Sequence, residues 1–148
     1  SGLPSKSGYP CKIVFRDLCR GPLACYLCSK ALESHDHIFF NCTYTSFIWQ
    51  VIQNKMNSHI TAANSDDLIQ AAATLWQDRS PAHIISRICF AETIYYIWQE
   101  RNNRVFNDVS KSCDVLLSTI ICNIYHIVGV AWKKDVNVQM YMARWQTM

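Results

Sequence analysis

The chain has 148 residues, of which half are apolar and 17% are charged, and its formal net charge is +3. This length and composition predict one folded domain with a hydrophobic core and exclude a disordered chain. The net charge is too modest to be the signature of a dedicated DNA-binding protein. A chain this long and this rich in core residues also does not need its eight cysteines for a disulfide scaffold.

Residues 1–21 are expected to form a basic N-terminal arm. Proline and glycine residues predict a loop over residues 1–10, and a short helix is expected over residues 11–20. Residues 1–30 contain five basic side chains and one acidic side chain, so they carry a net charge of +4. Positive charge therefore gathers at this end of the sequence.

Four potential metal ligands follow in the pattern C-x2-C-x8-H-x4-C: Cys25, Cys28, His37 and Cys42. A Cys-x-x-Cys pair brings two thiolates together on one tight turn, and a His and a third Cys complete a tetrahedral Cys3His site. Zinc binds thiolate and imidazole well and has no geometric preference of its own. Four protein ligands leave no open position, so the spacing predicts one structural Zn²⁺.

The alternative is that Cys25 and Cys28 are ordinary core or redox cysteines. A redox Cys-x-x-Cys pair usually opens a helix after a strand, whereas here a polar Ser-Lys turn follows it, which favours the metal. Cys11 and Cys19 are alternative ligands. His35 lies two residues from His37, where it is either an exposed turn residue or a competitor for the zinc.

Three other cysteines fall in apolar helical stretches and are predicted to be buried thiols: Cys89, Cys113 and Cys122. The sequence shows no signal-peptide pattern. Together with the reduced cysteines that zinc binding requires, this predicts an intracellular, reducing compartment, either the nucleus or the cytoplasm.

The remainder of the chain is predicted to be helical, with no convincing strand pattern. A helix is expected over residues 44–56, directly after the metal motif, and residues 59–64 are expected to be a linker. The next helix carries apolar residues between positions 68 and 76, and Asp66 is expected to cap its N-terminus.

The two longest helices are predicted in the C-terminal half. Ser80-Pro81 offers a capping side chain and then a proline at the first helical position, and this helix is expected to run to Phe106, before Asn107-Asp108. The following helix is predicted over residues 112–134, with two lysines at its end that suit the helix dipole. The two apolar stripes are expected to pack as a hairpin, with Ile84, Ile88, Tyr95 and Trp98 against Leu116, Ile120, Ile124 and Ile127.

Residues 115–132 contain no formally charged side chain, which raises the question of a membrane span. Thr119, Asn123 and His126 share one helical face, while aliphatic residues share another. This arrangement predicts an amphipathic helix of a folded core, and no membrane role is expected. Residues 136–145 alternate briefly in polarity and are expected to form either a final short helix or an edge segment.

These patterns predict a mainly α-helical fold, in which a small Cys3His zinc knuckle packs on a helical bundle with a long helical hairpin. The expected organisation is a basic arm or short helix at residues 1–21, the knuckle and its following helix at residues 22–56, and a helical region at residues 57–148. All three parts are expected to belong to a single compact domain.

Two segments of the chain carry a recognisable family pattern. In the first, residues 25–49, a Cys-x-x-Cys pair is followed by Glu33-Ser34 in a turn, then by HIFF at residues 37–40, Cys42 and Trp49. This segment resembles the zinc-binding domain found near the C-terminus of plant non-LTR (LINE-type) retrotransposon reverse transcriptases. The second, IWQERNNRVF at residues 97–106, is similar to a helix end that often follows the zinc module in these elements.

The resemblance implies a stand-alone or domesticated fragment of such an element. It covers 35 residues, and residues 3–21 match the family's upstream apolar helix poorly. A reverse transcriptase needs paired metal-binding aspartates, but the only adjacent acidic pair, Asp66-Asp67, stands at a predicted helix start. With no phosphate-binding glycine loop and no nucleophile elbow either, we expect a module that is not an enzyme.

Two functions remain open from the sequence. The first is a protein-interaction module that binds another protein or self-associates, since five Trp and seven Tyr are many for so small a domain to bury. The alternative is an RNA- or DNA-binding module, with Tyr26 or Tyr44 stacking on unpaired bases. Its candidate phosphate contacts are Arg101, Asn102, Asn103 and Arg104, with Lys6, Lys12, Arg16 and Arg20 in the arm.

Arg101 and Arg104 also have a plainer interpretation. Arginine near the end of a helix stabilises the last turn, and Arg101 is placed to pair with Glu100 or Asp108. No small-molecule substrate is expected in either case.

Overall fold

The computed structural model describes residues 24–56, 64–75, 77 and 79–147. Within them the chain forms one π-helix and five α-helices: η1 (His37–Asn41), α2 (Thr43–Met56), α3 (Ser65–Leu75), α4 (Pro81–Phe106), α5 (Cys113–Ala131) and α6 (Val136–Thr147). Their only β-type pairing is an isolated antiparallel bridge between Ala24 and Leu32. The predicted fold, mainly α with a Cys3His cluster packed on helices, is confirmed. The predicted helix at residues 11–20 lies outside the described residues.

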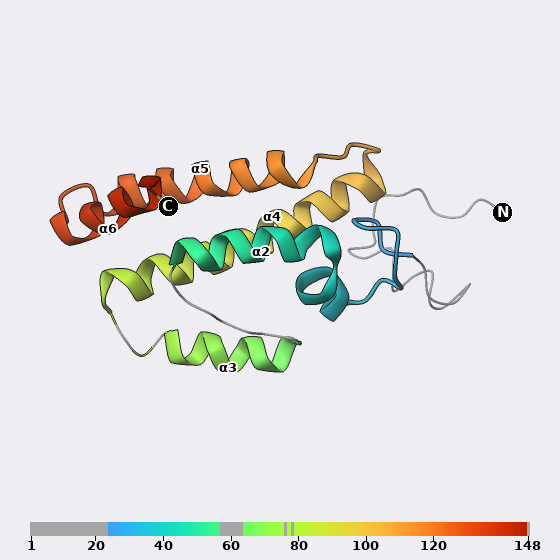
Figure 1. Cartoon of the computed structure of the whole chain (residues 1–148), viewed down its shortest axis with the longest axis horizontal. Helices are drawn as coiled ribbons and strands as arrows, with labels where there is room; N and C mark the ends of the chain where they lie inside the picture. The colour runs from blue at the N-terminus through green and yellow to red at the C-terminus, as the bar shows by residue number, and fades with distance from the viewer. Residues whose placement is uncertain (1–23, 57–63, 76, 78, 148) are drawn as a thin grey trace.

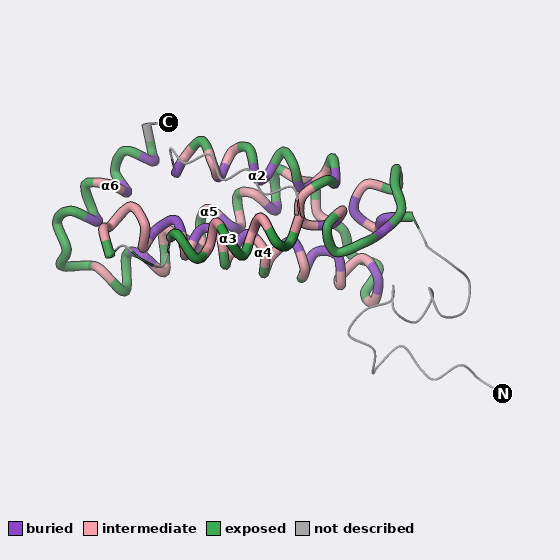
Figure 2. Tube along the Cα trace, turned by 90° about the horizontal axis from the view of Figure 1, so that it is seen from below, coloured by how far each residue is buried: buried purple, intermediate pink, exposed green. Residues whose placement is uncertain are grey.

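The longest helix, α4, is the centre of the fold, and its partners lie along it (Figure 1). α4 and α5 run in opposite directions as the predicted hairpin, α2 contacts both of them, and α3 packs against α4. α6 folds back to contact α4 and α5. Figure 2 shows buried and exposed positions recurring along the helices, as expected for amphipathic helices that share a core.

The main core lies between α2, α4, α5 and α6. Its buried residues are Ile48, Ile52 and Met56 of α2, Ile85 and Cys89 of α4, Leu116, Ile120, Ile124 and Val128 of α5, and Val138, Met142 and Trp145 of α6. A second cluster joins the knuckle to α2 and α4, and it contains Cys25, Leu27, Ile38, Cys42, Trp49 and Ile97. The knuckle therefore has its own hydrophobic contact with the helices.

The predicted core stripe of α5 is largely correct, whereas that of α4 is correct only at Ile88, which packs against the main core. Ile84 and Ile88 are only half-buried, Tyr95 is 56% exposed, and Trp98 packs at the knuckle cluster instead. The buried side of α4 runs through Ile85, Cys89, Thr93, Ile97 and Arg101. Two of these are polar, and the Thr93 hydroxyl is satisfied by donating to the Cys89 carbonyl at 2.6 Å. Hydrophobic periodicity alone does not identify such a stripe.

Local signals placed most helix ends correctly. The Ser80 hydroxyl accepts from the His83 N–H, with Pro81 next in the chain, and the Ser112 hydroxyl accepts from the Val115 N–H. α4 ends before Asn107, and Asp108 takes a left-handed conformation with φ of 56°.

Three predictions about helix ends need correction or completion. The cap of α3 is Asn64, whose side-chain oxygen accepts from the Asp67 N–H at 2.9 Å, and not Asp66. α5 ends at Ala131, so Lys133 and Lys134 lie in the turn beyond it. The C-terminal tail is the helix α6, not an edge segment. Its first turn is capped by the Asp135 carboxylate, which accepts from two backbone N–H groups.

By length and composition, α5 is a helix that would be able to span a membrane. Its aliphatic side nevertheless packs into the main core through Leu116, Ile120, Ile124 and Val128. The opposite side, which includes Val115 and Val130, is exposed in the described part of the chain.

Candidate metal centre

The first two ligand candidates stand on a tight turn closed by backbone hydrogen bonds. The Cys25 N–H donates to the Ala31 carbonyl at 2.7 Å, and the Ser29 N–H donates to the Cys25 carbonyl at 2.8 Å. Ser29 takes a positive φ of 57°, which reverses the chain after Cys28. Backbone N–H groups also point at both sulfurs, from Leu27 to Cys25 Sγ at 3.4 Å and from Lys30 to Cys28 Sγ at 3.5 Å. Such donors stabilise thiolates.

The other two candidates flank the π-helix η1. His37 is its first residue, and its N–H donates to the Ser34 hydroxyl at 3.0 Å. Cys42 follows its last residue and leads into α2. The Thr45 hydroxyl donates to the Ile38 carbonyl at 2.9 Å, and the Trp49 indole N–H donates to the Phe39 carbonyl at 2.5 Å. α2 thus fixes the segment that carries His37 and Cys42.

The four side chains converge on one point. The sulfurs of Cys25, Cys28 and Cys42 and a ring nitrogen of His37 all lie within 4.8 Å of one another. Cys25 Sγ is 3.9 Å from Cys42 Sγ, and Cys28 Sγ is 3.3 Å from His37 Nε2. Tetrahedral zinc with Zn–S bonds of about 2.3 Å would place two sulfurs about 3.8 Å apart. The donor set and its spacing therefore fit zinc.

The hydrogen bond between Cys25 and Cys42 affects the pKa of both thiols. The hydrogen bond between Cys25 and Cys42, followed by burial, raises the pKa of the Cys25 thiol. The same hydrogen bond lowers the pKa of Cys42, and backbone N–H groups of Tyr44 and Thr45 lower it further. The two thiols hydrogen-bond to each other, and a metal would have to displace the protons that they hold.

The apolar cover of the centre comes mainly from η1. Phe39 is half-exposed but packs against the knuckle cluster and toward Trp98, with ring centroids 6.2 Å apart, and Phe40 is also half-exposed. Ile38 is fully buried and supplies cover from η1. His35 is exposed and stacks on Trp98 at 6.2 Å, so it is a surface turn residue and not part of the ligand cluster.

A buried ion pair connects the knuckle to α4. Arg101 and Glu33 are both buried, and Arg101 Nη2 lies 2.6 Å from Glu33 Oε1, with Nε at 3.2 Å from the same oxygen. The second carboxylate oxygen accepts from the Tyr26 N–H at 3.1 Å. The Arg101 guanidinium also lies 5.6 Å from the ring centroid of Tyr26 and 5.4 Å from that of Trp98. Charge pairing and ring contacts thus stabilise the same guanidinium.

Arg104 makes the second connection, directly to the turn between Cys25 and Cys28. Its Nη1 donates to the Tyr26 and Leu27 carbonyls at 3.2 and 3.0 Å, and its Nη2 donates to the Lys111 carbonyl at 2.8 Å. Its Nε pairs with Glu100 Oε1 at 2.8 Å. The guanidinium therefore spans three segments: the knuckle, α4 and the loop before α5.

These contacts give the two arginines a structural role, as the plainer interpretation of the sequence expected. Arg101 is 0% exposed and has its charge paired, so it presents no guanidinium to phosphate. Arg104 is directed at backbone carbonyls and Glu100. Asn102 and Asn103 are half-buried; Asn102 accepts from Arg101, and Asn103 accepts from Asn107. The predicted arm residues Lys6, Lys12, Arg16 and Arg20 lie outside the described residues, as do Cys11 and Cys19.

Residues 16–49 match the family model for zinc-binding in reverse transcriptase. This match supports a reverse-transcriptase-associated zinc-binding domain at the position of the cluster. No curated protein and no solved structure shows significant similarity to the chain. The matched segment ends at Trp49, the residue whose indole closes the knuckle against α2, although the helix itself continues to Met56.

Glu33 was not predicted as the partner of Arg101, for which the sequence indicated Glu100 or Asp108. A signal was present, because the acidic turn and the arginine-rich helix end were the two segments that resembled the same family. Of the cysteines predicted to be buried thiols, Cys89 is buried, Cys113 is half-buried and Cys122 is exposed. The error at Cys122 arises because α5 packs through only one side, and Cys122 lies on the other side with Ser118 and His126.

Proposed function

We propose that this chain is a non-catalytic zinc-binding module derived from a plant LINE-type retrotransposon, present as a stand-alone or domesticated fragment. Its zinc would be held by Cys25, Cys28, His37 and Cys42. When bound, the metal would join the Cys-x-x-Cys turn to the start of α2. The observation that carries this proposal is the convergence of these four ligand atoms within 4.8 Å, in the segment that matches the zinc-binding family.

We further propose that the module acts as a protein-interaction domain in a reducing compartment. The arginines that suggested phosphate binding are committed to the interior, where they attach the knuckle to α4. Several large apolar side chains are instead exposed on the described helices, including Ile69, Val130 and Met140. Exposed apolar side chains of this size favour a protein partner over a polyanion.

The zinc assignment is tested by metal analysis of the purified chain. We expect about one zinc per chain, released by Cys28→Ser with loss of structure in the knuckle. Cys113→Ser is the matched control, since Cys113 is half-buried in α5 and away from the cluster. Zinc retained in Cys28→Ser, or lost in Cys113→Ser, would contradict the ligand set.

A nucleic-acid-binding module is the alternative function, and the +4 charge of residues 1–30 favours it. Zinc-loaded protein titrated with labelled single- and double-stranded DNA and RNA across a salt series separates the two. Micromolar or tighter binding that falls steeply with salt would indicate phosphate contacts. Arg16→Ala with Arg20→Ala would then weaken binding, whereas no binding at low salt would favour the protein-interaction proposal.

A further inference from the structure

The outward side of α5 forms a continuous face without charge. We call it the outer stripe, and it consists of Val115, Ser118, Thr119, Cys122, His126, Gly129 and Val130. All are exposed except Thr119, which is half-buried. Their spacing of three, four and seven residues places them on one side of an α-helix. Its apolar members Val115, Cys122 and Val130 are exposed and do not belong to the main core, which α5 joins through its other side.

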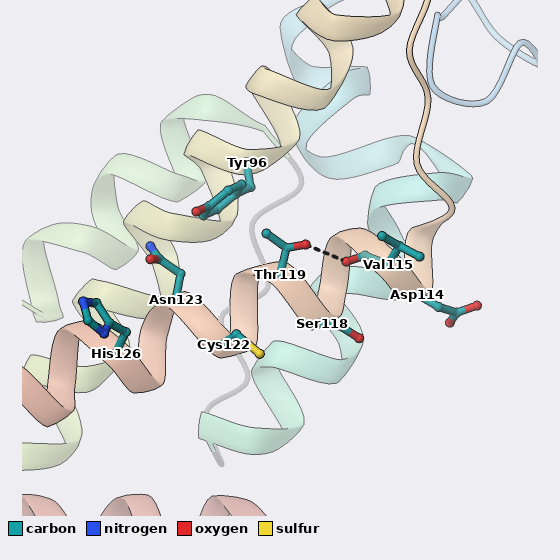
Figure 3. A pocket seen from close by; sticks show the side chains of 8 residues that line it. All are labelled: Tyr96, Asp114, Val115, Ser118, Thr119, Cys122, Asn123 and His126. Atoms are coloured by element: carbon teal, nitrogen blue, oxygen red, sulfur yellow. Dashed lines mark hydrogen bonds between the residues drawn. The ribbon is translucent and has the colours of Figure 1, made fainter.

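The outer stripe is shallowly hollowed beside α4. Figure 3 shows Tyr96 of α4 next to Thr119 and Asn123 of α5, while Asp114 points away at the start of the helix. Most of the stripe's side chains are small, and a Cβ added at Gly129 would meet nothing within 4 Å. Small side chains allow a second helix to approach closely, because the distance between packed helices follows the side chains at the contact.

Charges of opposite sign stand at the two ends of the stripe. Asp114 lies in the first turn of α5, and Lys133 and Lys134 follow its last turn; all three are exposed. Lys111 precedes Asp114 and Asp135 follows the lysines, so residues 108–114 carry a net charge of −1 and residues 133–135 carry a net charge of +1. Between them, residues 115–132 carry no Asp, Glu, Lys or Arg. An identical helix placed antiparallel brings the acidic end of each copy to the basic end of the other. A parallel arrangement brings like charges together, which is unfavourable.

We propose that the outer stripe docks a second copy of this chain, with the two α5 helices antiparallel about a two-fold axis near Cys122. The proposal rests on the protein-interaction function above and names its partner and surface. In this register Ser118 faces the partner's His126, and Val115 faces the partner's Gly129, whose missing side chain leaves room. Asp114 lies near the partner's Lys133. A two-fold axis makes each of these contacts twice, since the same patch is used on both copies.

The neutral stripe argues against the other occupants. A nucleic acid requires positive charge along its contact, and the stripe has none between its ends. A lipid surface would receive a purely apolar face best, whereas this one contains Ser118, Thr119 and His126. These polar groups can pair with one another across a helix–helix contact.

The first test is sedimentation of the zinc-loaded full chain from about 1 to about 300 µM, a range suited to a small interface. We expect reversible dimers in the wild type. Cys122→Arg and Val130→Glu should each weaken association by at least about tenfold, because each puts like charges at the contact. Ile69→Glu on α3 is the matched control, since Ile69 is 66% exposed and Val130 is 69% exposed, and it should leave the dimer unchanged.

The second test addresses the antiparallel register. Reversing the charge at either end of the stripe should weaken the dimer: Asp114→Lys at one end, or Lys133→Glu with Lys134→Glu at the other. A variant with all three changes should restore the dimer, because opposite charges then meet again. Bismaleimide treatment should link Cys122 to the partner's Cys122, identified by peptide mass, and Cys122→Ser should remove that product. Absence of rescue and of the Cys122 cross-link would overturn the antiparallel arrangement.

Two further outcomes would overturn the proposal. Wild-type protein that stays monomeric at the highest concentration contradicts it, and so does a dimer that survives both Cys122→Arg and Val130→Glu. A monomer that co-sediments with phosphatidylcholine vesicles would assign the stripe to lipid instead. Zinc content and helical circular dichroism are measured on every variant. A metal-loaded, folded monomer therefore contradicts only this proposal, whereas missing zinc contradicts the proposed function.

Discussion

Arg101 and Glu33 stand 68 positions apart in the sequence and form a buried ion pair, with Arg101 Nη2 2.6 Å from Glu33 Oε1. Glu33 belongs to the turn between the two pairs of ligand candidates, and Arg101 belongs to the last third of α4. The pair thus joins the two sequence segments that resembled one family. In this chain the second segment is the docking site of the first.

Removing the charge of only one partner of this ion pair should strongly destabilise the fold. Glu33→Gln leaves the Arg101 charge buried without a counter-charge, and we expect the free energy of unfolding to fall by roughly 3–5 kcal/mol. Urea denaturation of the zinc-loaded protein, followed by tryptophan fluorescence, measures the change. Glu33→Gln combined with Arg101→Met should cost much less than the sum of the two single changes, because no charge is then left unpaired. Additive losses would contradict the pairing.

Arg104 should affect the metal without touching it. Its Nη1 holds the Tyr26 and Leu27 carbonyls of the Cys-x-x-Cys turn, and Arg104→Lys cannot reproduce this forked contact. Loss of outer contacts that orient metal ligands typically lowers metal affinity by about 10–100-fold, and we expect a change in that range. A competition titration with a chromophoric zinc chelator measures it. Arg87→Lys, the same exchange elsewhere on α4, should leave zinc affinity unchanged; equal effects at both positions would assign no special role to Arg104.

Removal of the metal should unfold the knuckle and spare the helical bundle. The knuckle shares one cluster with Trp49 and Ile97, whereas the core between α2, α4, α5 and α6 contains none of the ligand candidates. After chelation we expect hydrogen exchange to accelerate over residues 24–42 and to stay slow in α5. Tryptophan fluorescence should also change, since Trp49 loses its hydrogen bond to the Phe39 carbonyl. Uniform acceleration along the chain would mean that the metal stabilises the whole fold.

The sequence was informative where a feature depends on neighbours in the chain. The ligand spacing from Cys25 to Cys42 and the caps at Ser80 and Ser112 are local patterns, and the structure brings the ligands together and uses both caps. The buried face of α4 was missed because it includes polar residues whose partners are distant, above all Arg101 with Glu33. Hydrophobic periodicity predicts that charged residues lie on the surface. The ion pair that allows Arg101 to be buried is visible only in the folded structure.

Contacts between distant residues also decide which residue caps α3. Asn64 and Asp66 are both suitable caps and stand two positions apart. The structure uses Asn64, and the neighbouring Ser65 is bound by the Asp36 carboxylate, which accepts from its N–H at 3.1 Å and from its hydroxyl at 2.7 Å. A residue of the knuckle region thus contacts the start of α3. Sequence alone contains no information about which of two equivalent caps such a contact will favour.

The two sides of α5 should respond very differently to the loss of side-chain atoms. Ile124 is 0% exposed in the main core, so Ile124→Ala leaves a cavity and should lower the free energy of unfolding by about 2–5 kcal/mol. Val115 is 52% exposed on the same helix, so Val115→Ala should change it by less than about 0.5 kcal/mol. Urea denaturation should be carried out at low micromolar concentration, where self-association does not contribute. A cost at Val115 comparable to that at Ile124 would show that its side of α5 is already packed within one chain.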